Sequence, residues 1–349
     1  MSRKIKSRRI FYYDDEEEEV VDKKKIVYLF ILLLLTGVLL STSTYAWFTT
    51  NRVVKVDMID VKVQTEGSLE ISVDAVNFKA GVTAEEIIGA HNGNYPSSVN
   101  QLPSYIDPVS TAGVLDGRGF MEMYLGVISS NDVGDYIVTS EKTEEVEGNG
   151  EFSGGKFVAF DLFLRNSADK ELYLTNESQV KYNGTANSGI ENAIRVAFVV
   201  EGTVSSDDAL GAMHSLRTSD SNNVYIWEPN YDTHTDTGIN HAREVYNIST
   251  VASGAPRIPY DGIKAEFGES NNVTFARATS SDFPNFFSSV VPKIATINGN
   301  PTYQDLWLLR AGVTKVRVYL WLEGQDVDCE NGASVGNVSF NLQFSTNPS

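Results

Sequence analysis

The residues with the clearest capacity for chemistry are three carboxylates near the end of the chain. The segment from Asp326 to Gly332 places acidic side chains at alternate positions before a glycine, and they belong to Asp326, Asp328 and Glu330. Loops with such oxygen ligands bind calcium, but an EF-hand loop requires glycine at its sixth position and glutamate at its twelfth. Asn331 and Asn337 occupy those positions here. We therefore expect an acidic hairpin turn, with a calcium site as the alternative.

A second group of candidate ligands lies earlier in the chain, with His241 close behind it. Its members are Asp232, His234 and Asp236. They offer a second cation site of equally low specificity. Many zinc hydrolases bind their metal through H-E-x-x-H, but the residues after His241 read Ala-Arg-Glu-Val. Zinc hydrolysis therefore has no support in the sequence, and we predict no cofactor, with calcium as the alternative.

Two further residues carry nucleophilic side chains. Gly332-Ala-Ser-Val-Gly336 matches the letters of the nucleophile elbow, which requires a strand before the serine and a helix after it. Here an acidic loop precedes the serine, and alternating strand-like residues follow it. Cys329 lies among carboxylates, which disfavour a reactive thiolate. We predict that the chain has no catalytic residues and is not an enzyme.

The composition limits the classes of protein to which the chain can belong. Its 349 residues are 42% hydrophobic and 21% charged, which is typical of globular proteins. A formal net charge of −18 repels phosphate backbones, so we expect no nucleic-acid partner. The single cysteine, Cys329, excludes an intrachain disulfide and a multi-cysteine zinc site.

The N-terminus predicts export from the cytoplasm. Residues 1–25 form a charged segment that ends in three lysines, and residues 26–46 contain no charged side chain. Basic residues favour the cytoplasmic side of a membrane, so the body of the chain, residues 47–349, is expected outside.

The end of the apolar segment has small residues at the positions that a signal peptidase recognises. Thr44 and Ala46 occupy these positions, so we expect cleavage before Trp47. The alternative is an uncleaved membrane anchor, because residues 26–48 are long enough to span a bilayer. In lineages that form disulfides, exported domains of this size usually carry several of them, whereas this chain has one cysteine. We therefore expect a secreted or cell-surface protein of a Gram-positive-type bacterium.

The exported body has a dominant hydrophobic period of two, which is typical of β-strands. In its first strand the alternation slips by one residue, and the apolar residues are Val54, Val56, Met58, Ile59, Val61 and Val63. Such a slip predicts a β-bulge or a strand that crosses between sheets.

Alternating or β-branched runs predict further strands along the body. They lie at residues 69–73, 157–164, 172–174, 194–201, 316–323 and 339–345. Residues 82–90 favour a short helix, capped by Thr83 with Glu86 completing a capping box. No alternation of strands and helices is present, so two packed antiparallel sheets remain. We predict an all-β fold, a jelly-roll-like antiparallel β-sandwich with a long loop-rich insertion at about residues 203–300.

Four aromatic residues are candidates for ligand binding. Tyr319 and Trp321 lie on the face of their predicted strand opposite to its aliphatic residues. They either pack beneath the insertion or form a ligand platform or a subunit contact. Trp227 and Tyr231 lie in the predicted insertion, where they would serve an adhesin or a glycan-binding module.

The residues around the expected cleavage site resemble a known family. Thr42-Ser-Thr-Tyr-Ala-Trp-Phe-Thr-Thr-Asn51 resembles the export signals and mature N-termini of the TasA/camelysin-like family, whose signals are cut by a SipW-type peptidase. Residues 160–167 look like an inner strand of that family, and residues 338–344 are similar to its closing strand. The resemblance implies a jelly-roll-like sandwich that acts as a matrix fibre subunit or a surface-associated protein.

In some members of that family the N-terminal strand is donated to the next subunit. A sandwich that lacks one strand exposes an apolar groove and open edges, and a strand from a neighbour fills both. Residues 47–64 would be the donor here, or the same strand folds into its own sandwich. The expected function is that of an exported, self-associating structural protein of the cell surface or extracellular matrix. A membrane-anchored adhesin or glycan-binding module is the alternative, and a hydrolase that uses His234 or His241 is the third hypothesis.

Overall fold

The fold is taken from a computed structural model. It describes residues 27–28, 31–32, 54–64, 68–130, 136–143, 155–183, 189–230, 233–245, 261–266, 287–289, 294–295, 304–326, 328–329 and 337–347. The chain divides into two compact units, Met1–Thr44 and Tyr45–Ser349. The four described residues of the first unit are helical.

The predicted export segment lies almost entirely outside the described residues, and so do Thr44, Ala46 and Trp47 of the expected cleavage site. In the part of the chain that is described, no helix combines the length and the apolar character needed to cross a bilayer. Export and cleavage therefore stay predictions.

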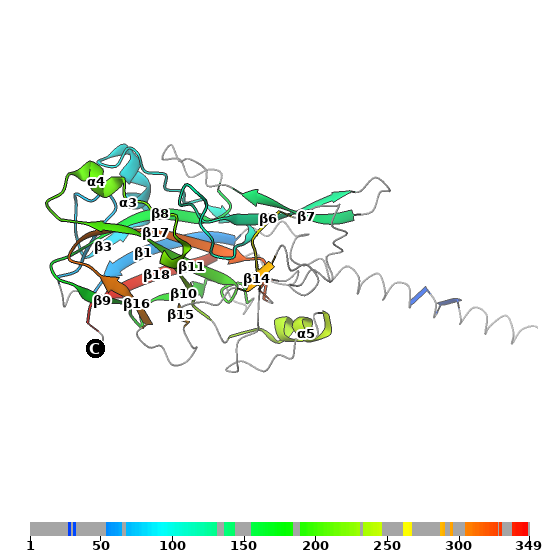
Figure 1. The fold of residues 1–349 in the computed structure, drawn as a ribbon. Coiled ribbons are helices and arrows are strands. Elements are labelled where there is room, and N and C mark those ends of the chain that lie inside the picture. The colour runs from blue at the N-terminus through cyan, green and yellow to red at the C-terminus, as the bar shows by residue number, and fades with distance from the viewer. Residues whose placement is uncertain are drawn as a thin grey trace, which may run out of the picture. The chain divides into compact units, whose positions relative to one another are not determined.

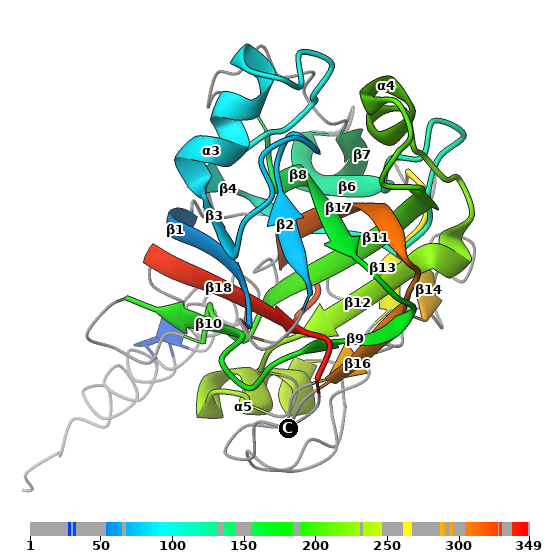
Figure 2. The same cartoon turned by 90° about the vertical axis from the view of Figure 1, so that its left-hand side faces the viewer.

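Two mixed β-sheets pack against each other in the second unit (Figures 1 and 2). Among the described residues, sheet A has seven strands, which are β1 (Val54–Val63), β3 (Gly81–Thr83), β4 (Tyr105–Ile106), β9 (Lys170–Leu174), β10 (Gln179–Tyr182), β16 (Gln304–Leu309) and β18 (Asn337–Ser345). Their order is β16-β9-β18-β1-β3, with β4 beside β1 and β10 beside β18.

Sheet B is the larger of the two. Its nine described strands are β2 (Glu70–Ser72), β5 (Pro108–Ser110), β6 (Met123–Ser130), β7 (Tyr136–Thr143), β8 (Val158–Asn166), β11 (Ile194–Val204), β12 (Val224–Glu228), β15 (Ile294–Ala295) and β17 (Gly312–Glu323). Their order is β15-β12-β11-β17-β5-β6-β7, with β8 beside β17 and β2 beside β8. The predicted all-β sandwich is confirmed.

The expectation of purely antiparallel sheets is corrected in one respect. Most neighbouring strands are antiparallel, but β1 with β18, β12 with β15 and β5 with β17 pair in parallel. Parallel partners need a long connection between them. The members of each pair are far apart in the sequence, so the rest of the chain supplies that connection.

The main core fills the space between the two sheets. Alternate side chains of β17 point into it, namely Val316, Val318, Leu320 and Leu322. From sheet A, Val338, Phe340, Leu342 and Phe344 of β18 meet the same core. The period of two in the sequence therefore separates inner from outer residues correctly on both strands.

A second apolar cluster covers the outer face of sheet B. Tyr319 and Trp321 are fully buried there and lie with Val109, Met121 and Phe157. Their interpretation as packed aromatic residues is confirmed, and a ligand platform is excluded because neither ring is exposed. Residues 109–125 supply much of the described cover, and Val224 and Ile226 of the predicted insertion belong to the same cluster.

The remaining elements are short. Helix α3 (Ala84–Gly89) follows Thr83, whose backbone N–H donates to the Glu86 carboxylate at 3.1 Å, as the predicted capping box requires. Residues 203–300 contribute β12 to sheet B, and they also form the hairpin of β13 (Asp261–Ile263) and β14 (Phe287–Ser289). The same region holds the helices α4 (Leu210–His214) and α5 (Asp236–Val245).

Candidate functional site

The predicted donor strand, β1, lies inside sheet A between β18 on one edge and β3 and β4 on the other (Figure 2). It pairs with β18 in parallel from Lys55 to Val63 and with the two short strands in antiparallel fashion. The register shifts between Val56 and Met58, so the predicted bulge is confirmed. A bulge moves the following side chains to the opposite face, so β1 fits its position in one register.

Burial of apolar side chains adds to the main-chain pairing of β1. The buried ones among the predicted donor residues are Val54, Ile59, Val61 and Val63. Val56 packs against the same core while partly exposed, and the side chain of Met58 lies outside the described residues. Burying one such aliphatic side chain fully is worth about 1.5–3 kcal/mol. β1 is therefore held by both of its edges and by its inner face.

The structure brings the two predicted cation sites together. Asp326 and Asp328 follow β17, and His234 lies just before α5. The ligand atoms of these three residues lie within 4.8 Å of one another. Asp232, Glu330 and the side chain of His241 lie outside the described residues, and Asp236 begins α5 without joining this group of ligand atoms.

Both oxygens of Asp328 are already occupied by hydrogen-bond donors. Oδ2 accepts from His234 Nδ1 at 3.0 Å and from Asn192 Nδ2 at 3.1 Å. Oδ1 accepts from the backbone N–H and the hydroxyl of Thr235, at 2.9 and 2.6 Å. Asp328 therefore joins the loop after β17 to the segments before β11 and α5.

The oxygens of Asp326 are occupied as well. Oδ2 accepts from the guanidinium of Arg195, and Oδ1 accepts from the backbone N–H of Asp328 at 2.8 Å. Arg195 also pairs with Glu228 at 2.6 Å. A cation would have to displace a guanidinium that is charged at every accessible pH. The residues therefore do not fit a calcium ion in this arrangement, and we interpret them as a clamp between loops.

This clamp belongs to a set that we call the arginine cluster. It is formed by the partly buried His234 and five buried residues: Arg195, Glu228, Glu323, Asp326 and Asp328. Burial alone would lower the pKa of His234, but the hydrogen bond to Asp328 and the charges of Asp326 and Asp328 raise it. Burial raises the pKa of Glu323 to about 7, although the indole N–H of Trp321 donates to its carboxylate at 3.0 Å. Glu228, Glu323 and Asp326 thus share one guanidinium, and Asp328 pairs with His234 beside them.

A second buried set lies further along the outer face of sheet B, and we call it the lysine cluster. Its members are Asp161, Glu201, Lys315 and Arg317, all at most 3% exposed. Lys315 Nζ lies 2.7 Å from Glu201 Oε2 and 3.3 Å from Asp161 Oδ2. Arg317 binds Asp161 Oδ1 at 2.6 Å. Two acids and two bases therefore balance within this cluster.

The cover above the lysine cluster supplies further polar contacts. The Tyr95 hydroxyl donates to Asp161 Oδ2 at 2.7 Å, and its ring stacks on His214 with the centroids 4.1 Å apart. Burial alone would raise the pKa of Asp161, but the charges of Lys315 and Arg317 hold it well below its ordinary value. Burial raises the pKa of Glu201, and the charge of Asp161 adds to this.

Sequence reasoning missed the central residues of both clusters. Asp161, Arg195 and Lys315 each lie in a strand that is rich in apolar residues and carries few charges. A charge in such a strand is a usable signal, since charged side chains are rarely buried without a partner. The sequence alone does not show which strands bring the partners.

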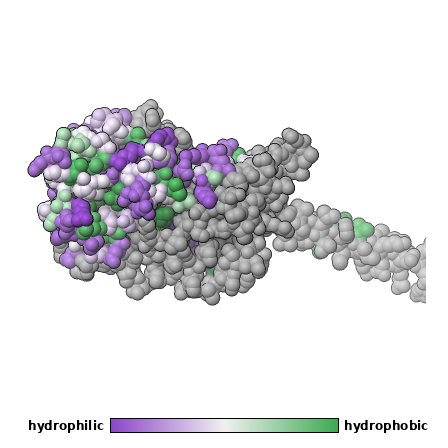
Figure 3. All heavy atoms as spheres, in the orientation of Figure 1, coloured by the Kyte–Doolittle hydropathy of each residue, from purple (hydrophilic) through white to green (hydrophobic). Residues whose placement is uncertain are grey.

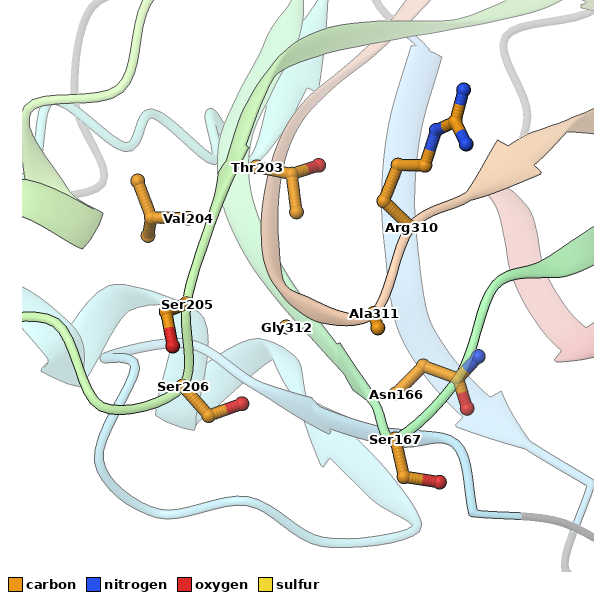
Figure 4. A pocket seen from close by; sticks show the side chains of 9 residues that line it. All are labelled: Asn166, Ser167, Thr203, Val204, Ser205, Ser206, Arg310, Ala311 and Gly312. Carbon is orange, nitrogen blue, oxygen red and sulfur yellow. The ribbon is translucent and has the colours of Figure 1, made fainter.

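A polar pocket of about 560 Å³ lies at one end of the sandwich (Figure 4). Three chain segments line it, which are Asn166–Ser167, Thr203–Ser206 and Arg310–Gly312. Thr203 hydrogen-bonds to Thr314 at 2.7 Å, and Arg310 pairs with Asp169 at 2.7 Å. None of the described lining residues is aromatic, so the pocket lacks the ring on which a sugar would stack.

The surface shown in Figure 3 mixes hydrophilic and hydrophobic residues in small areas. The exposed large hydrophobic residues of the second unit are scattered among the described elements: Val76, Tyr105, Val114, Leu210 and Leu308. Trp227, expected on a glycan-binding loop, is 1% exposed and lies in the main core. That expectation is wrong for Trp227, because β12 continues sheet B and turns this side chain inward. Tyr231 lies outside the described residues.

Comparisons with known proteins found no match among protein-family models, curated proteins or solved structures. The resemblance to the TasA/camelysin-like family therefore rests on the local residues quoted above.

Proposed function

We propose that this chain is an exported, non-catalytic structural protein of the cell surface or extracellular matrix, and that β1 serves as a donor strand in its self-assembly. The observation that carries the proposal is the place of β1. It is the first described strand after the N-terminal unit, and it lies between β18 and the two short strands β3 and β4.

The contacts of β1 favour exchange between copies. Its partners are β18, the last described strand, and two strands of two and three residues. Without β1, the edge of β18 and an apolar groove would be open, which is the situation that strand addition resolves. A second copy of β1 would make the same main-chain bonds and bury the same valines and isoleucine. Head-to-tail exchange of this kind propagates into filaments when the rotation between copies does not close.

Strand addition in trans tests the proposal directly. A chain that begins at Thr65 lacks β1, and a labelled peptide of residues 47–64 supplies it. We expect saturable binding of the peptide, with recovery of the folded state measured by near-ultraviolet circular dichroism.

Two neighbouring residues provide matched peptide variants. Val61 is fully buried, whereas the side chain of Lys62 is about half exposed. The peptide with Val61→Asp should fail to bind, because a carboxylate would enter the core. The peptide with Lys62→Asp should still bind. Equal binding of the two variant peptides would contradict the proposal. So would a failure of all three peptides, the unchanged one included, to bind.

The alternative of an adhesin or glycan-binding module loses its main candidate residue with the burial of Trp227. No observation on the described residues favours it over a structural role.

A further inference from the structure

The lysine cluster places a primary amine between two carboxylates on three adjacent strands. Lys315 lies on β17, Asp161 on β8 at one side and Glu201 on β11 at the other. Asp161 stands opposite Arg317, and Lys315 stands opposite Phe163 and Gly202. The amine therefore lies between a carboxylate from each neighbouring strand, at 2.7 and 3.3 Å.

The surroundings exclude water and fix the amine. The side chains of Asp161, Glu201 and Lys315 are at most 1% exposed. Lys315 Nζ also donates to the backbone carbonyls of His214 and Leu216, at 3.2 and 3.1 Å. The amine therefore lies among four oxygen acceptors, each of which constrains its direction. Orientation of this kind is a large part of the acceleration of intramolecular reactions.

The two oxygens of Asp161 stand in different environments. Oδ1 is held by the Arg317 guanidinium at 2.6 Å. Oδ2 faces the amine and accepts the Tyr95 hydroxyl at 2.7 Å. A guanidinium on Oδ1 stabilises the negative charge that develops when a nucleophile adds to the carboxyl carbon. Oδ2 is the oxygen that would leave the carboxyl carbon when the amine adds to it.

Glu201 has the position of a proton relay. Its Oε2 is in ion-pair contact with the amine, and the described residues place no hydrogen-bond donor on its Oε1. A buried carboxylate next to an ammonium can accept a proton from it and pass it on.

We propose that Lys315 and Asp161 condense into an intramolecular isopeptide bond, with Glu201 as the proton relay. Nζ forms a bond to Cγ of Asp161, and the bond from Cγ to Oδ2 breaks. One ammonium proton first passes to Oδ2 of Asp161, so that a neutral amine faces a neutral carboxyl group. A second proton passes through Glu201 to the leaving Oδ2, which departs as water, and the third stays on the amide nitrogen. An ammonium and a carboxylate become an amide and water, so charge balances without an external reagent.

The cross-link has a clear purpose in an exported chain without disulfides. Cys329 is the one cysteine, so a disulfide within the chain is excluded. An amide between β8 and β17 would join two adjacent strands of sheet B and remove two buried charges, which are costly to keep away from water. The inference stands on this geometry alone and does not depend on strand donation by β1.

The mass of the intact purified protein tests the bond. We expect a mass lower than that of the sequence by one water molecule. After digestion with trypsin, residues 157–165 should remain joined to residues 311–317, with no cleavage after Lys315. The full sequence mass would overturn the proposal, and so would a missing water molecule that maps to any other pair of residues.

Two variants separate the reaction from the fold. Lys315→Arg keeps the positive charge but removes the amine, and Glu201→Gln keeps both reacting groups but removes the relay. Both should have the full sequence mass. Lys156→Arg is the matched control, because Lys156 also pairs with an aspartate, Asp107, but in a partly exposed position. It should keep the mass deficit of the unchanged protein. A deficit that persists in Lys315→Arg would contradict the assignment.

Discussion

The lysine cluster and the arginine cluster lie on the same face of sheet B and are separated by the second apolar cluster. Along β17, the outward residues run from Lys315 and Arg317 through Tyr319 and Trp321 to Glu323. Both clusters bury charge almost completely. They differ in the base that faces the carboxylates and in the balance of charge.

The difference determines what each cluster can do. A lysine amine becomes a nucleophile when it loses a proton, whereas a guanidinium stays protonated and acts as a fixed hydrogen-bonding fork. The lysine cluster can therefore form a bond, and the arginine cluster can only hold one conformation. The excess of carboxylates in the arginine cluster makes its stability depend on protons, as the raised pKa values of Glu323 and His234 indicate.

The largest effect should follow the loss of the guanidinium. Arg195→Met leaves Asp326 and Glu228 buried without their base, so the free energy of unfolding should fall by about 3–5 kcal/mol. Urea denaturation measures this. A fall below about 1 kcal/mol would contradict the interpretation of this cluster as a clamp.

The pH dependence of stability should be steep around the arginine cluster. Because the pKa of Glu323 rises from 4.5 to about 7 on folding, its protonated form is favoured in the folded state. The contribution of Glu323 to the stability of the folded state is complete below pH 4.5 and is lost as the pH rises through about 7. Glu323→Gln removes this cost of ionisation, so the variant should be more stable than the unchanged protein by about 3 kcal/mol at pH 8 and should match it at about pH 4. Parallel stability curves would show that Glu323 does not carry the dependence.

The lysine cluster should respond to a substitution that keeps its charge. Lys315→Arg retains an ion pair but cannot form the amide, so it should lower the free energy of unfolding by about 2–3 kcal/mol, as the loss of a covalent cross-link does. Denaturation of Lys315→Arg beside Lys156→Arg measures the difference. Equal stability of the two variants would argue for an ion pair alone.

The smallest effect is expected at an exposed pair. Arg310 and Asp169 lie at the polar pocket, and both side chains are about half exposed or more. Arg310→Met should change the free energy of unfolding by less than about 1 kcal/mol. A loss as large as that of Arg195→Met would remove the distinction between buried and exposed pairs on which the comparison depends.

Local sequence patterns correctly predicted the structural features that depend on residues close together in the sequence. The slip of the alternation at Met58 and Ile59 predicted the bulge of β1, and Thr83 with Glu86 predicted the start of α3. The alternation of β17 and β18 separated the two faces of each sheet. In each of these cases, the residues that decide the structure are neighbours along the chain.

The clusters could not be predicted in the same way, because their members come from strands far apart in the sequence. Asp326, Asp328 and His234 were identified as ligands, but Arg195, which occupies an oxygen of Asp326, was not. Asp161 lay in residues 157–164, which were predicted as a strand without any role for the charge. Trp227 was assigned to a surface loop because the sequence around it is polar, whereas the pairing of β12 with β11 buries it.

Both regions would suit the proposed exported protein, since one would hold the loops of sheet B in place and the other would join two of its strands covalently. The proposed structural role depends on β1. Negative-stain electron microscopy of residues 47–349, beside the same protein beginning at Thr65, tests that role most directly. We expect filaments from the longer protein alone. Dispersed single particles from both proteins would contradict the account, and closed dimers from the longer one would retain strand exchange but exclude a fibre.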